Sequence, residues 1–537
     1  MRNILCRVTG CVIVYALVRA AWAGPDIKLE MGGYWRVQGI QLFNQYDLDH
    51  VPTGTAPVEP AQHAAYLMQR LRLEPKLSFE KLVTLRMQAD VFDDAVWGDN
   101  EQATYGVPLF AEQPTSTNFL GQPVNSIQFK RAWLELNIPV GLLRIGRQPS
   151  NWGLGILSNA GDGFDDDFGE NHFGSTFDRI AFATKPISIY KTIKGAPNVD
   201  SNFIIAYAYD MLSEEPCVVD RPPLATRGFD CTFLDPVQRY TKFFNERPFG
   251  SSNWLSHNSN DVQEHILVAY YNNEKWHPWS VNDQLKFGTY IVFRVQNKSF
   301  TVPLRPPNPN TGFPGDVDNG AFAGIYDGYY KLRWGPWYSE AEGYYIRGRA
   351  SGVLPLGNYE KDAGIIGAVW RGGWMTDQFD AIFEWGYSSG DGNIGDGFFT
   401  QRPLHPDYNV GLILYEEVMR QRSYVVYSRF FANALQSLGG VIDSYYLFPR
   451  VRWRPFPGLE GVLGVLAAWR DQADNALFDP ARDSFMGFET DAGIKYSWAE
   501  DHLNFKLEGG LLFFGDALGE YNSSVASSLQ ARVAFLF

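Results

Sequence analysis

Apolar and polar side chains alternate along most of the chain with a period of two residues. In segment 284–296 the odd-numbered positions are mainly apolar and the even-numbered ones mainly polar or small, and segment 485–498 shows the same two-sided pattern. Such alternation is typical of β-strands with one apolar and one polar face. We predict eighteen strands, at residues 27–43, 64–79, 82–93, 126–138, 142–148, 178–185, 202–210, 263–272, 283–296, 321–334, 337–350, 360–372, 378–388, 441–454, 459–471, 485–498, 502–515 and 525–537.

The connections between the predicted strands are short and long in turn. Short turns, such as 80–81 and 335–336, follow even-numbered strands, and long connections, such as 94–125 and 389–440, follow odd-numbered ones. An even number of antiparallel strands with both termini on one side gives this parity. The pattern predicts an all-β transmembrane protein, an antiparallel up-and-down β-barrel of about 18 strands with long extracellular loops and short periplasmic turns.

Two features leave the strand count open. Pro75 and Pro449 lie within predicted strands, although proline cannot donate a hydrogen bond to a neighbouring strand. Segment 409–438 contains many apolar residues and could hold a helix or two further strands. Sixteen and twenty strands therefore remain alternatives to eighteen.

The segment 525–537, VASSLQARVAFLF, alternates in the same way and stops on Phe537. It resembles the closing strand of bacterial outer-membrane β-barrels, in which a terminal aromatic residue is read by the barrel-assembly machinery. The alternative is the last strand of a soluble β-sandwich. The resemblance implies the outer membrane as the location, with outer-membrane lipid, lipopolysaccharide and the assembly machinery as partners.

The first residues have the features of a secretory signal peptide. Arg2 and Arg7 flank the start of an apolar run at 8–18, and Ala21-Trp22-Ala23 supplies small residues of the kind that a signal peptidase accepts. We predict a signal peptide at residues 1–23 and one outer-membrane β-barrel domain at residues 24–537.

Composition narrows the class of protein further. Aromatic residues make up 15% of the chain, as expected for a barrel with aromatic girdles, and a net charge of -14 argues against binding to nucleic acid. Two of the four cysteines lie in the predicted signal peptide. Cys217 and Cys231 remain, close together in an exported chain, and predict one disulfide in a loop.

The polar faces of the strands predict the lining of the lumen. They carry more basic than acidic residues, although the whole chain is acidic. One interpretation is a water-filled conduit that favours anions, because rings of charge set selectivity. The other is that the charges pair across neighbouring strands and stiffen a plugged barrel. The predicted pore-lining residues are Arg72, Arg86, Arg131, Arg144, Arg147, Arg294, Lys331, Arg333, Glu384, Arg450 and Arg452.

Two acidic segments could bind a cation. Residues 161–170 read GDGFDDDFGE and residues 388–399 read SSGDGNIGDGFF, so closely spaced oxygen ligands alternate with glycine. Neither matches an EF-hand, and solvated acidic turns are the alternative. The candidate Ca²⁺ ligands are Asp391, Asn393 and Asp396, or Asp162, Asp165 and Asp167.

No set of residues for catalysis is recognisable, because G-x-S-x-G and H-E-x-x-H are absent and the eight histidines are scattered. We therefore expect no enzyme, with a hydrolase at the barrel rim as the weakest alternative.

Two stretches carry a family resemblance. FKRAWLELNIPVGLLRIGRQPSNWG at 129–153 and SSGDGNIGDGFFTQRPLHPDYNVG at 388–411 resemble porins and the alginate-export family. That resemblance implies an eighteen-stranded monomeric barrel with an arginine-rich lumen that anionic polysaccharide crosses, with Arg131, Arg144 and Arg147 as lumen residues. The many carboxylates predicted for this lumen depart from the family pattern.

These observations predict an outer-membrane channel, either a porin or an exporter, for small or polymeric hydrophilic solutes that are anionic. The alternative is a structural or interaction barrel without an open pore of its own, such as the sheath of a multiprotein conduit or an adhesion platform.

Overall fold

The computed structural model describes residues 27–45, 63–98, 127–164, 166–196, 200–211, 262–274, 276, 278–296, 320–351, 360–429, 436–519 and 523–537. The predicted signal peptide at residues 1–23 and the predicted disulfide between Cys217 and Cys231 lie outside these residues, and both stay predictions.

The described part of the chain forms eighteen wall strands. The strands are β1 (Ile27–Phe43), β2 (His63–Phe79), β3 (Val83–Gly98), β4 (Ile127–Ile138), β5 (Gly141–Pro149), β6 (Thr176–Thr184), β7 (Phe203–Met211), β8 (Val262–Asn273), β9 (Gln284–Gln296), β10 (Ala321–Trp334), β11 (Trp337–Ser351), β12 (Glu360–Met375), β13 (Phe379–Ser388), β15 (Ser444–Leu447), β16 (Arg450–Phe456), β17 (Leu459–Arg470), β18 (Phe485–Trp498), β19 (Leu503–Phe514) and β20 (Val525–Leu536). β15 and β16 are two parts of one wall strand, because both lie between β13 and β17.

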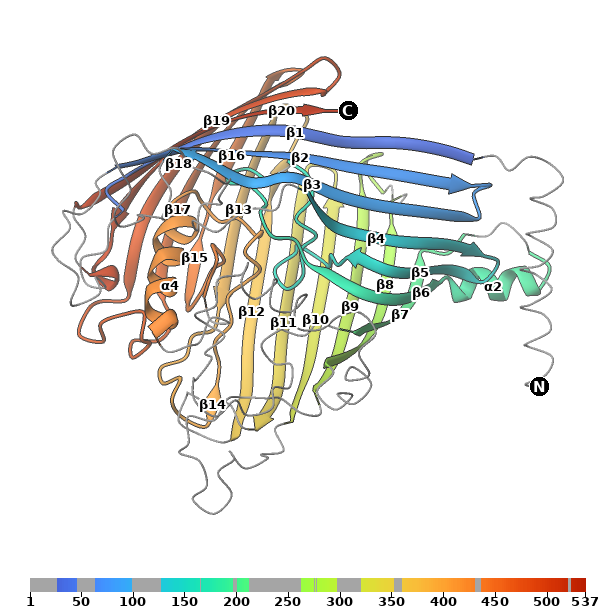
Figure 1. Ribbon diagram of the computed structural model, residues 1–537, viewed down its shortest axis with the longest axis horizontal. Coiled ribbons are helices and arrows are strands. Elements are labelled where there is room, and N and C mark those ends of the chain that lie inside the picture. The colour runs from blue at the N-terminus through green and yellow to red at the C-terminus, as the bar shows by residue number, and fades with distance from the viewer. Residues whose placement is uncertain are drawn as a thin grey trace.

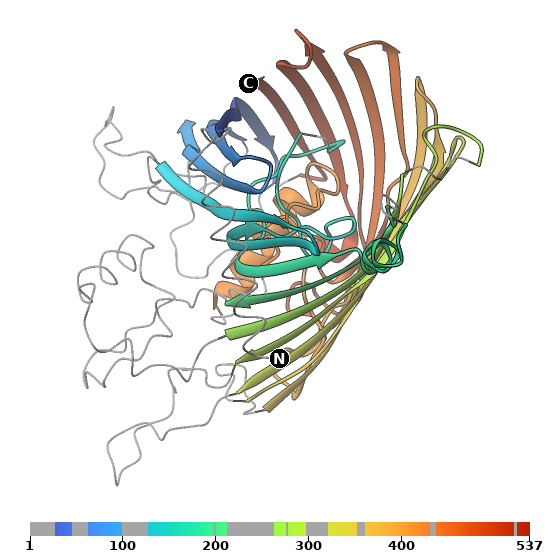
Figure 2. The ribbon, with the colours of Figure 1, turned by 90° about the vertical axis from the view of Figure 1, so that its right-hand side faces the viewer.

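The strands close into an antiparallel barrel (Figures 1 and 2). Each wall strand pairs with its neighbours along the chain, and β1 pairs with β20 over Tyr34↔Leu536 to Phe43↔Ser527. The predicted barrel of eighteen strands is thus confirmed. The predicted ends of the strands differ from the observed ends by a few residues at most, with two exceptions. The third strand continues to Gly98, and the fourteenth is broken at Pro449.

The two prolines and the segment 409–438, which left the predicted strand count open, do not change the number of wall strands among the described residues. Pro449 separates β15 from β16, but Phe448 exchanges backbone hydrogen bonds with Glu384 and keeps the wall continuous. Pro75 remains inside β2, opposite Met31. Segment 409–438 contains a π-helix, η3 (Leu414–Met419), and the helix α4 (Arg420–Arg429), and its described residues, 409–429 and 436–438, add no wall strand. The remaining elements are α2 (Pro186–Ile193), the short 3-10 helix η5 (Asp516–Leu518) and the two-residue β14 (Phe398–Phe399).

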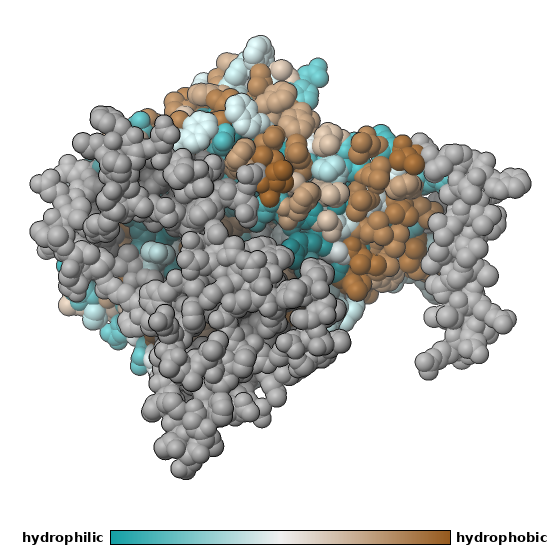
Figure 3. Space-filling view, in the orientation of Figure 1, coloured by the Kyte–Doolittle hydropathy of each residue, from teal (hydrophilic) through white to brown (hydrophobic). Residues whose placement is uncertain are grey.

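The outer face of the barrel is apolar. Alternation directs side chains such as Ile145, Leu463, Ile494 and Val533 outward, and each is exposed. Figure 3 shows such side chains gathered over the part of the wall where β1 to β6 lie in Figure 1. Exposed tryptophans lie beside the short turns, as in an aromatic girdle; they include Trp334, Trp337, Trp374, Trp453 and Trp498.

A closed barrel with an apolar outer band is a structure that can cross a bilayer, because no backbone edge meets lipid. Among the described residues, no helix combines the length and the apolar character needed to cross a membrane. The described residues thus form a β-barrel of the kind that spans a membrane.

Two long loops fold back into the barrel. They are called loop A (residues 150–175, between β5 and β6) and loop B (residues 389–443, between β13 and β15). Figure 2 shows the loop A trace in teal and helix α4 of loop B in orange inside the ring of strands. The sequence predicted long loops at the extracellular end, and these two leave that end but then turn inward. Their apolar side chains form much of the buried core, with Ile156 in loop A and Leu404, Val410 and Ile413 in loop B.

Candidate functional site

Arginines from several strands point into the barrel where loop A crosses it. Alternation along β1, β2, β4 and β20 places every second side chain inward. Five of these inward side chains are arginines with no more than 3% of their surface exposed: Arg36, Arg70, Arg72, Arg131 and Arg532. Buried guanidinium groups need anionic partners, because an unpaired buried charge is costly. Loop A supplies several of these partners.

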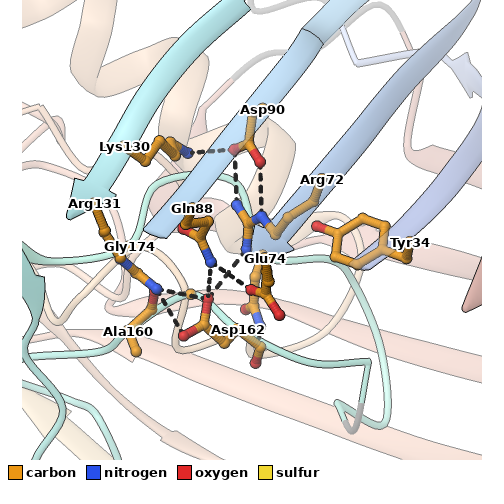
Figure 4. Close-up of polar contacts among 12 residues, drawn as sticks. Tyr34, Arg72, Glu74, Gln88, Asp90, Lys130, Arg131, Ala160, Asp162 and Gly174 are labelled. Atoms are coloured by element: carbon orange, nitrogen blue, oxygen red, sulfur yellow. Dashed lines mark hydrogen bonds and ion pairs between the residues drawn. The ribbon is translucent and has the colours of Figure 1, made fainter. Parts of the chain in front are cut away.

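Asp162 of loop A lies between Arg72 and Arg131 (Figure 4). Its carboxylate is 3.1 Å from Nη1 of Arg72 and accepts hydrogen bonds of 2.9 and 2.8 Å from Nη1 of Arg131. Arg72 also donates to both oxygens of Asp90 on β3, at 2.8 and 2.9 Å. Lys130 lies 3.4 Å from the same Asp90. Asp162 therefore completes a network of ion pairs that joins loop A to three strands.

Two further carboxylates of loop A are held in the same way. Glu170 pairs with Arg36 on β1, at 3.1 Å, and with Arg532 on β20. Asp167 pairs with Arg452 and, at 3.4 Å, with Arg450, both on β16. Burial alone would raise the pKa of Asp167, but the guanidinium groups of Arg450 and Arg452 hold it below its usual value. Asp162, Asp167 and Glu170 are called the loop A carboxylates below.

Asp166, between two of these residues, has a different environment. It accepts a hydrogen bond of 3.2 Å from Asn409 of loop B rather than one from an arginine. Burial raises the pKa of Asp166 to about 6, because the positive charges of Lys506 and Arg371 compensate only in part. Asp166 is thus a carboxyl group whose charge can change near neutral pH.

One carboxylate of the wall holds three consecutive backbone N–H groups of loop B. The carboxylate of Glu489 on β18 accepts hydrogen bonds from the backbone N–H groups of Leu412, Ile413 and Leu414, at 2.6, 2.8 and 2.7 Å. The apolar side chains of these three residues are fully buried. Tyr408 donates to Glu384 on β13 at 3.0 Å.

Asp407 of loop B joins the two loops. Its carboxylate accepts the backbone N–H groups of His172, Phe173 and Gly174 in loop A, at 2.7, 3.0 and 2.5 Å. His405 lies nearby and contacts Ser175 through Nε2 at 3.0 Å. Burial lowers the pKa of His405 to about 4 in spite of the nearby Asp407, so this imidazole is neutral at physiological pH.

The base of loop A is fixed on the other side of the barrel. Trp152 donates from Nε1 to Asp327 on β10 at 2.8 Å and stacks on Tyr290 of β9, with ring centroids 5.4 Å apart. Glu342 on β11 accepts the backbone N–H of Gly155 at 2.9 Å. Loop A therefore spans the lumen from β9–β11 to the arginines of β1, β2, β4, β16 and β20.

A small cavity marks where both loops meet the wall. Its volume is about 20 Å³, and a water needs about 10–15 Å³ of this kind of space. Burial raises the pKa of Glu416, which lines it, well above the usual value, although Arg420 lies close by. The lining residues are Gln38, Ile40, Tyr66 and Met68 of β1 and β2, Gln530 of β20, Gly169, Glu170 and His172 of loop A, and Glu416, Glu417 and Arg420 of loop B.

Ten of the eleven predicted pore-lining residues lie on the inward face of their strands. Most are paired: Arg86 and Arg144 with Glu135, Arg294 with Glu264, and Lys331 with Glu340. The inward residues are Arg72, Arg86, Arg131, Arg144, Arg294, Lys331, Arg333, Glu384, Arg450 and Arg452. A role of these side chains in lining an open path stays a prediction.

Arg147 does not lie where the family resemblance implied. It shares the outward face of β5 with Ile145, and it pairs at 2.6 Å with Asp178, which shares the outward face of β6 with Ile180. Arg144 and Arg147 are three positions apart, and an odd offset in a strand changes the face. Arg147 is therefore a residue of the barrel exterior.

The predicted calcium ligands are engaged within their own loops. Asp391 accepts the backbone N–H groups of Asn393 and Thr400, Asn393 accepts that of Gly395, and Asp396 accepts that of Phe398. In the described part of the chain, no three His, Cys, Asp or Glu side chains are grouped as a metal site would need. Of the other acidic set, Asp162 and Asp167 pair with arginines, and Asp165 lies outside the described residues.

The sequence analysis did not single out Arg36, Arg532 or Glu170. Arg36 and Arg532 do fall on the polar face of strands with clear alternation, so the pattern could have identified them. Glu170 ends the acidic segment 161–170, and nothing local distinguishes a carboxylate that turns inward from one that faces solvent.

The closed wall, the apolar exterior, the charged interior and the inward loops define a membrane-spanning β-barrel whose lumen two loops narrow. No protein-family model and no curated protein matches the chain. The alginate-export resemblance therefore stays a prediction.

The solved structures to which the chain is similar include three from Pseudomonas aeruginosa. They are OpdK with vanillate (10% identity, TM-score 0.45, 95% of this chain and 98% of that chain covered), OccK9, or OpdG (12%, 0.47, 95% and 99%), and OccK2, or OpdF, in complex with glucuronate (10%, 0.43, 95% and 98%).

Proposed function

We propose that this protein is an outer-membrane channel for hydrophilic anionic solutes, with a path that loops A and B narrow. One observation carries the proposal: buried arginines from β1, β2, β4, β16 and β20 converge on the narrow part of a closed barrel. Guanidinium groups bind carboxylates and phosphates through parallel hydrogen bonds and stay charged at any physiological pH. Fixed positive charge on a narrow wall attracts anions and repels cations.

The charge of the wall supports the preference for anions. Near Asp162 the wall contributes Arg36, Arg70, Arg72, Lys130, Arg131 and Arg532, against Glu74, Asp90 and Asp93 as wall carboxylates. Asp162 and Glu170 of loop A reduce this excess of positive charge. A solute anion near this part of the wall would therefore meet arginines that the wall alone does not neutralise.

The test is ion selectivity in planar bilayers. Replacing Arg450 and Arg452 by Ser removes two inward charges of one strand, and the ratio of anion to cation permeability should fall by about twofold or more, most clearly at low salt. Arg147→Ser is the matched control, because it removes an arginine from the outer face of the same barrel. An unchanged reversal potential in the folded double variant would contradict an anion path beside β16.

The second candidate is a structural or interaction barrel without an open pore. The observation in its favour is the packing of loop B, whose apolar residues fill part of the lumen and are fully buried. Such a barrel would conduct no ions in bilayers, either as the wild type or after substitutions in the loop A carboxylates. Conductance of the wild type at any salt concentration would contradict this second candidate.

A further inference from the structure

We propose that helix α2 is a membrane-binding element at the rim of the barrel. Its apolar face inserts into the lipid leaflet at the end that carries the short turns, and its lysines contact anionic headgroups of that leaflet. This inference concerns a surface outside the lumen and goes beyond the proposed channel function. It requires only that the barrel spans a bilayer.

Helix α2 lies in the connection between β6 and β7, at the rim of the barrel (Figures 1 and 2). This connection comprises residues 185–202, whereas residues 139–140 alone join β4 to β5 at the same end. Thr184, the last residue of β6, donates from Oγ1 to the backbone oxygen of Val140 at 2.7 Å. The helix therefore begins beside a short turn, where the apolar outer band of the wall ends.

The two ends of α2 are fixed by local sequence. Pro186 lies in the first turn, where the missing N–H of proline costs no helical hydrogen bond. Gly195 has a φ of 83°, and its N–H donates to the carbonyl of Thr192 at 3.1 Å. The N–H of Ala196 donates to the carbonyl of Lys191 at 3.0 Å, which completes a Schellman motif. The sequence thus specifies a helix of about two turns that stops at both ends.

The polar face of α2 is the one that holds the helix to the chain. Ser188 and Thr192 are four positions apart and share this face. The Ser188 Oγ accepts the backbone N–H of Ser201, just before β7, at 2.8 Å, and Thr192 donates from Oγ1 to the Ser188 carbonyl at 2.9 Å. A surface helix of a globular protein normally turns its apolar face to the protein. In α2 this orientation is reversed.

The opposite face of α2 is apolar and exposed. Ile189, Tyr190 and Ile193 lie on it, and the side chains of Tyr190 and Ile193 are 60% and 77% exposed. None of the eight residues of α2 is buried. A helix this short is marginal in water and depends on the packing of its apolar face. The described residues supply no such packing, whereas lipid beside the rim can supply it.

The charge of the segment favours a leaflet with anionic headgroups. The charged residues of segment 185–200 are Lys185, Lys191, Lys194 and Asp200, so the segment is basic in a chain whose net charge is -14. Lys185 pairs with Asp200 at 2.6 Å, and Lys191 and Lys194 are exposed at the end of the helix. Lysines beside an exposed apolar face are typical of helices that lie in the interface of an anionic leaflet.

The experiment places a spin label on each face of α2 in the full-length barrel. Ile193→Cys carries the label on the apolar face, and Thr192→Cys is the matched control on the polar face, both in a Cys217→Ser/Cys231→Ser background. The vesicles contain phosphatidylcholine and phosphatidylglycerol. Collisions with oxygen, which concentrates in lipid, are compared with collisions with a water-soluble nickel chelate. The ratio of oxygen to nickel collisions should be about fivefold higher at position 193 than at position 192.

Equal ratios at the two positions in the folded, heat-modifiable barrel would overturn the inference. Dipolar broadening between labels on two molecules would assign the apolar face to a second copy of the chain and would overturn it as well. If Ile193→Cys does not fold, Tyr190→Cys carries the label on the same face, with the same expected ratio.

The headgroup contact is tested in the same vesicles. Lys191→Gln/Lys194→Gln, or vesicles of phosphatidylcholine alone, should lower the ratio at position 193 by about twofold or more. An unchanged ratio in both cases would contradict the contact with anionic headgroups. Planar bilayers keep this inference apart from the channel, because a barrel that is silent there but has a lipid-exposed label at position 193 would contradict the channel alone.

Discussion

Loops A and B both fill the lumen, but they are attached by different interactions. The loop A carboxylates meet arginines of the wall, and one of them, Asp162, is partly exposed. Loop B reaches the wall through backbone N–H groups on Glu489 and through apolar side chains that are fully buried. Water and dissolved anions compete with the first kind of contact far more than with the second. The contacts of loop B on Glu489 should therefore be less sensitive to salt and dissolved anions than the contact of Asp162 with its arginines.

The largest effect is expected from removing the anchor of loop B. Glu489→Ala leaves the N–H groups of Leu412, Ile413 and Leu414 without their acceptor, and each buried orphan group costs about 1–3 kcal/mol, so docking should weaken by about 3 kcal/mol or more. Limited proteolysis of loop B measures the change.

Glu489→Gln is the control for this prediction, because it keeps one acceptor oxygen at the same place and should retain part of the protection. Equal resistance of Glu489→Ala and the wild type to protease would show that the apolar side chains hold loop B without Glu489.

A smaller effect is expected where the two loops meet. Asp407→Ala removes the acceptor of three backbone N–H groups in loop A, at residues that lie partly exposed, and should weaken the contact between the loops by about 2 kcal/mol. Hydrogen exchange of the amides of residues 172–174 should become faster, while exchange at 412–414 should stay slow. Faster exchange at both places would mean that the loops open together and that their attachments are not independent.

Acidification should strengthen the docking of loop A modestly. The folded-state pKa of Asp166 is about 6 and its unfolded value is about 3.9, so the folded form binds the proton more tightly. Protonation of Asp166 therefore stabilises the docked form of loop A as the pH falls through 6 towards 4, and this stabilisation is lost as the pH rises. The free energy of docking should change by about 1 kcal/mol between pH 5 and pH 7. Hydrogen exchange of the loop A amides at pH 5 and pH 7, corrected for the intrinsic exchange rate, measures this change in docking free energy. The variant Asp166→Asn should lose most of the difference between the two pH values. A pH dependence that survives in that variant would have another source, such as Glu416.

Salt should have the smallest effect. Raising the ionic strength from about 0.05 to 1 M screens the partly exposed Asp162 more than the buried Glu170, so loop A should weaken by about 0.5 kcal/mol near Asp162. Hydrogen exchange near residues 160–163 reports this change, and loop B provides the internal reference. A larger loss near Glu170 than near Asp162 would contradict this dependence of screening on exposure.

The wall of the barrel could be predicted from the sequence because contact with lipid requires apolar side chains on the outward face of every strand. Val451 and Trp453 had to face outward, which placed Arg450 and Arg452 inside. The break in the wall strand at Pro449 follows from the missing N–H of proline, although the alternation predicts an unbroken strand at 441–454. Helices η3 and α4 lie in an apolar segment that is equally compatible with strands, so only the closed wall excludes further strands there.

The interior of the barrel could be predicted only in part. Asp162 pairs with Arg131 across 31 positions and with Arg72 across 90, and no local pattern signals contacts of that length. The same run of Asp and Gly would suit a solvated turn, a cation site or an arginine cluster. The family motif predicts Arg147 in the lumen, whereas the alternation puts this residue on the same face as Ile145, where the structure has it.

The seam between β1 and β20 sets the order in which this barrel can be completed. The two strands are the first and the last of the wall to be synthesised, and their pairing ends where Gly33 and Phe537 exchange backbone hydrogen bonds of 3.1 Å in both directions. Until β20 is in place, β1 and β19 each present a row of unpaired N–H and C=O groups, which hydrocarbon cannot solvate. A partly built wall therefore has no stable resting state in lipid, and its two edges must be shielded until the last strand arrives.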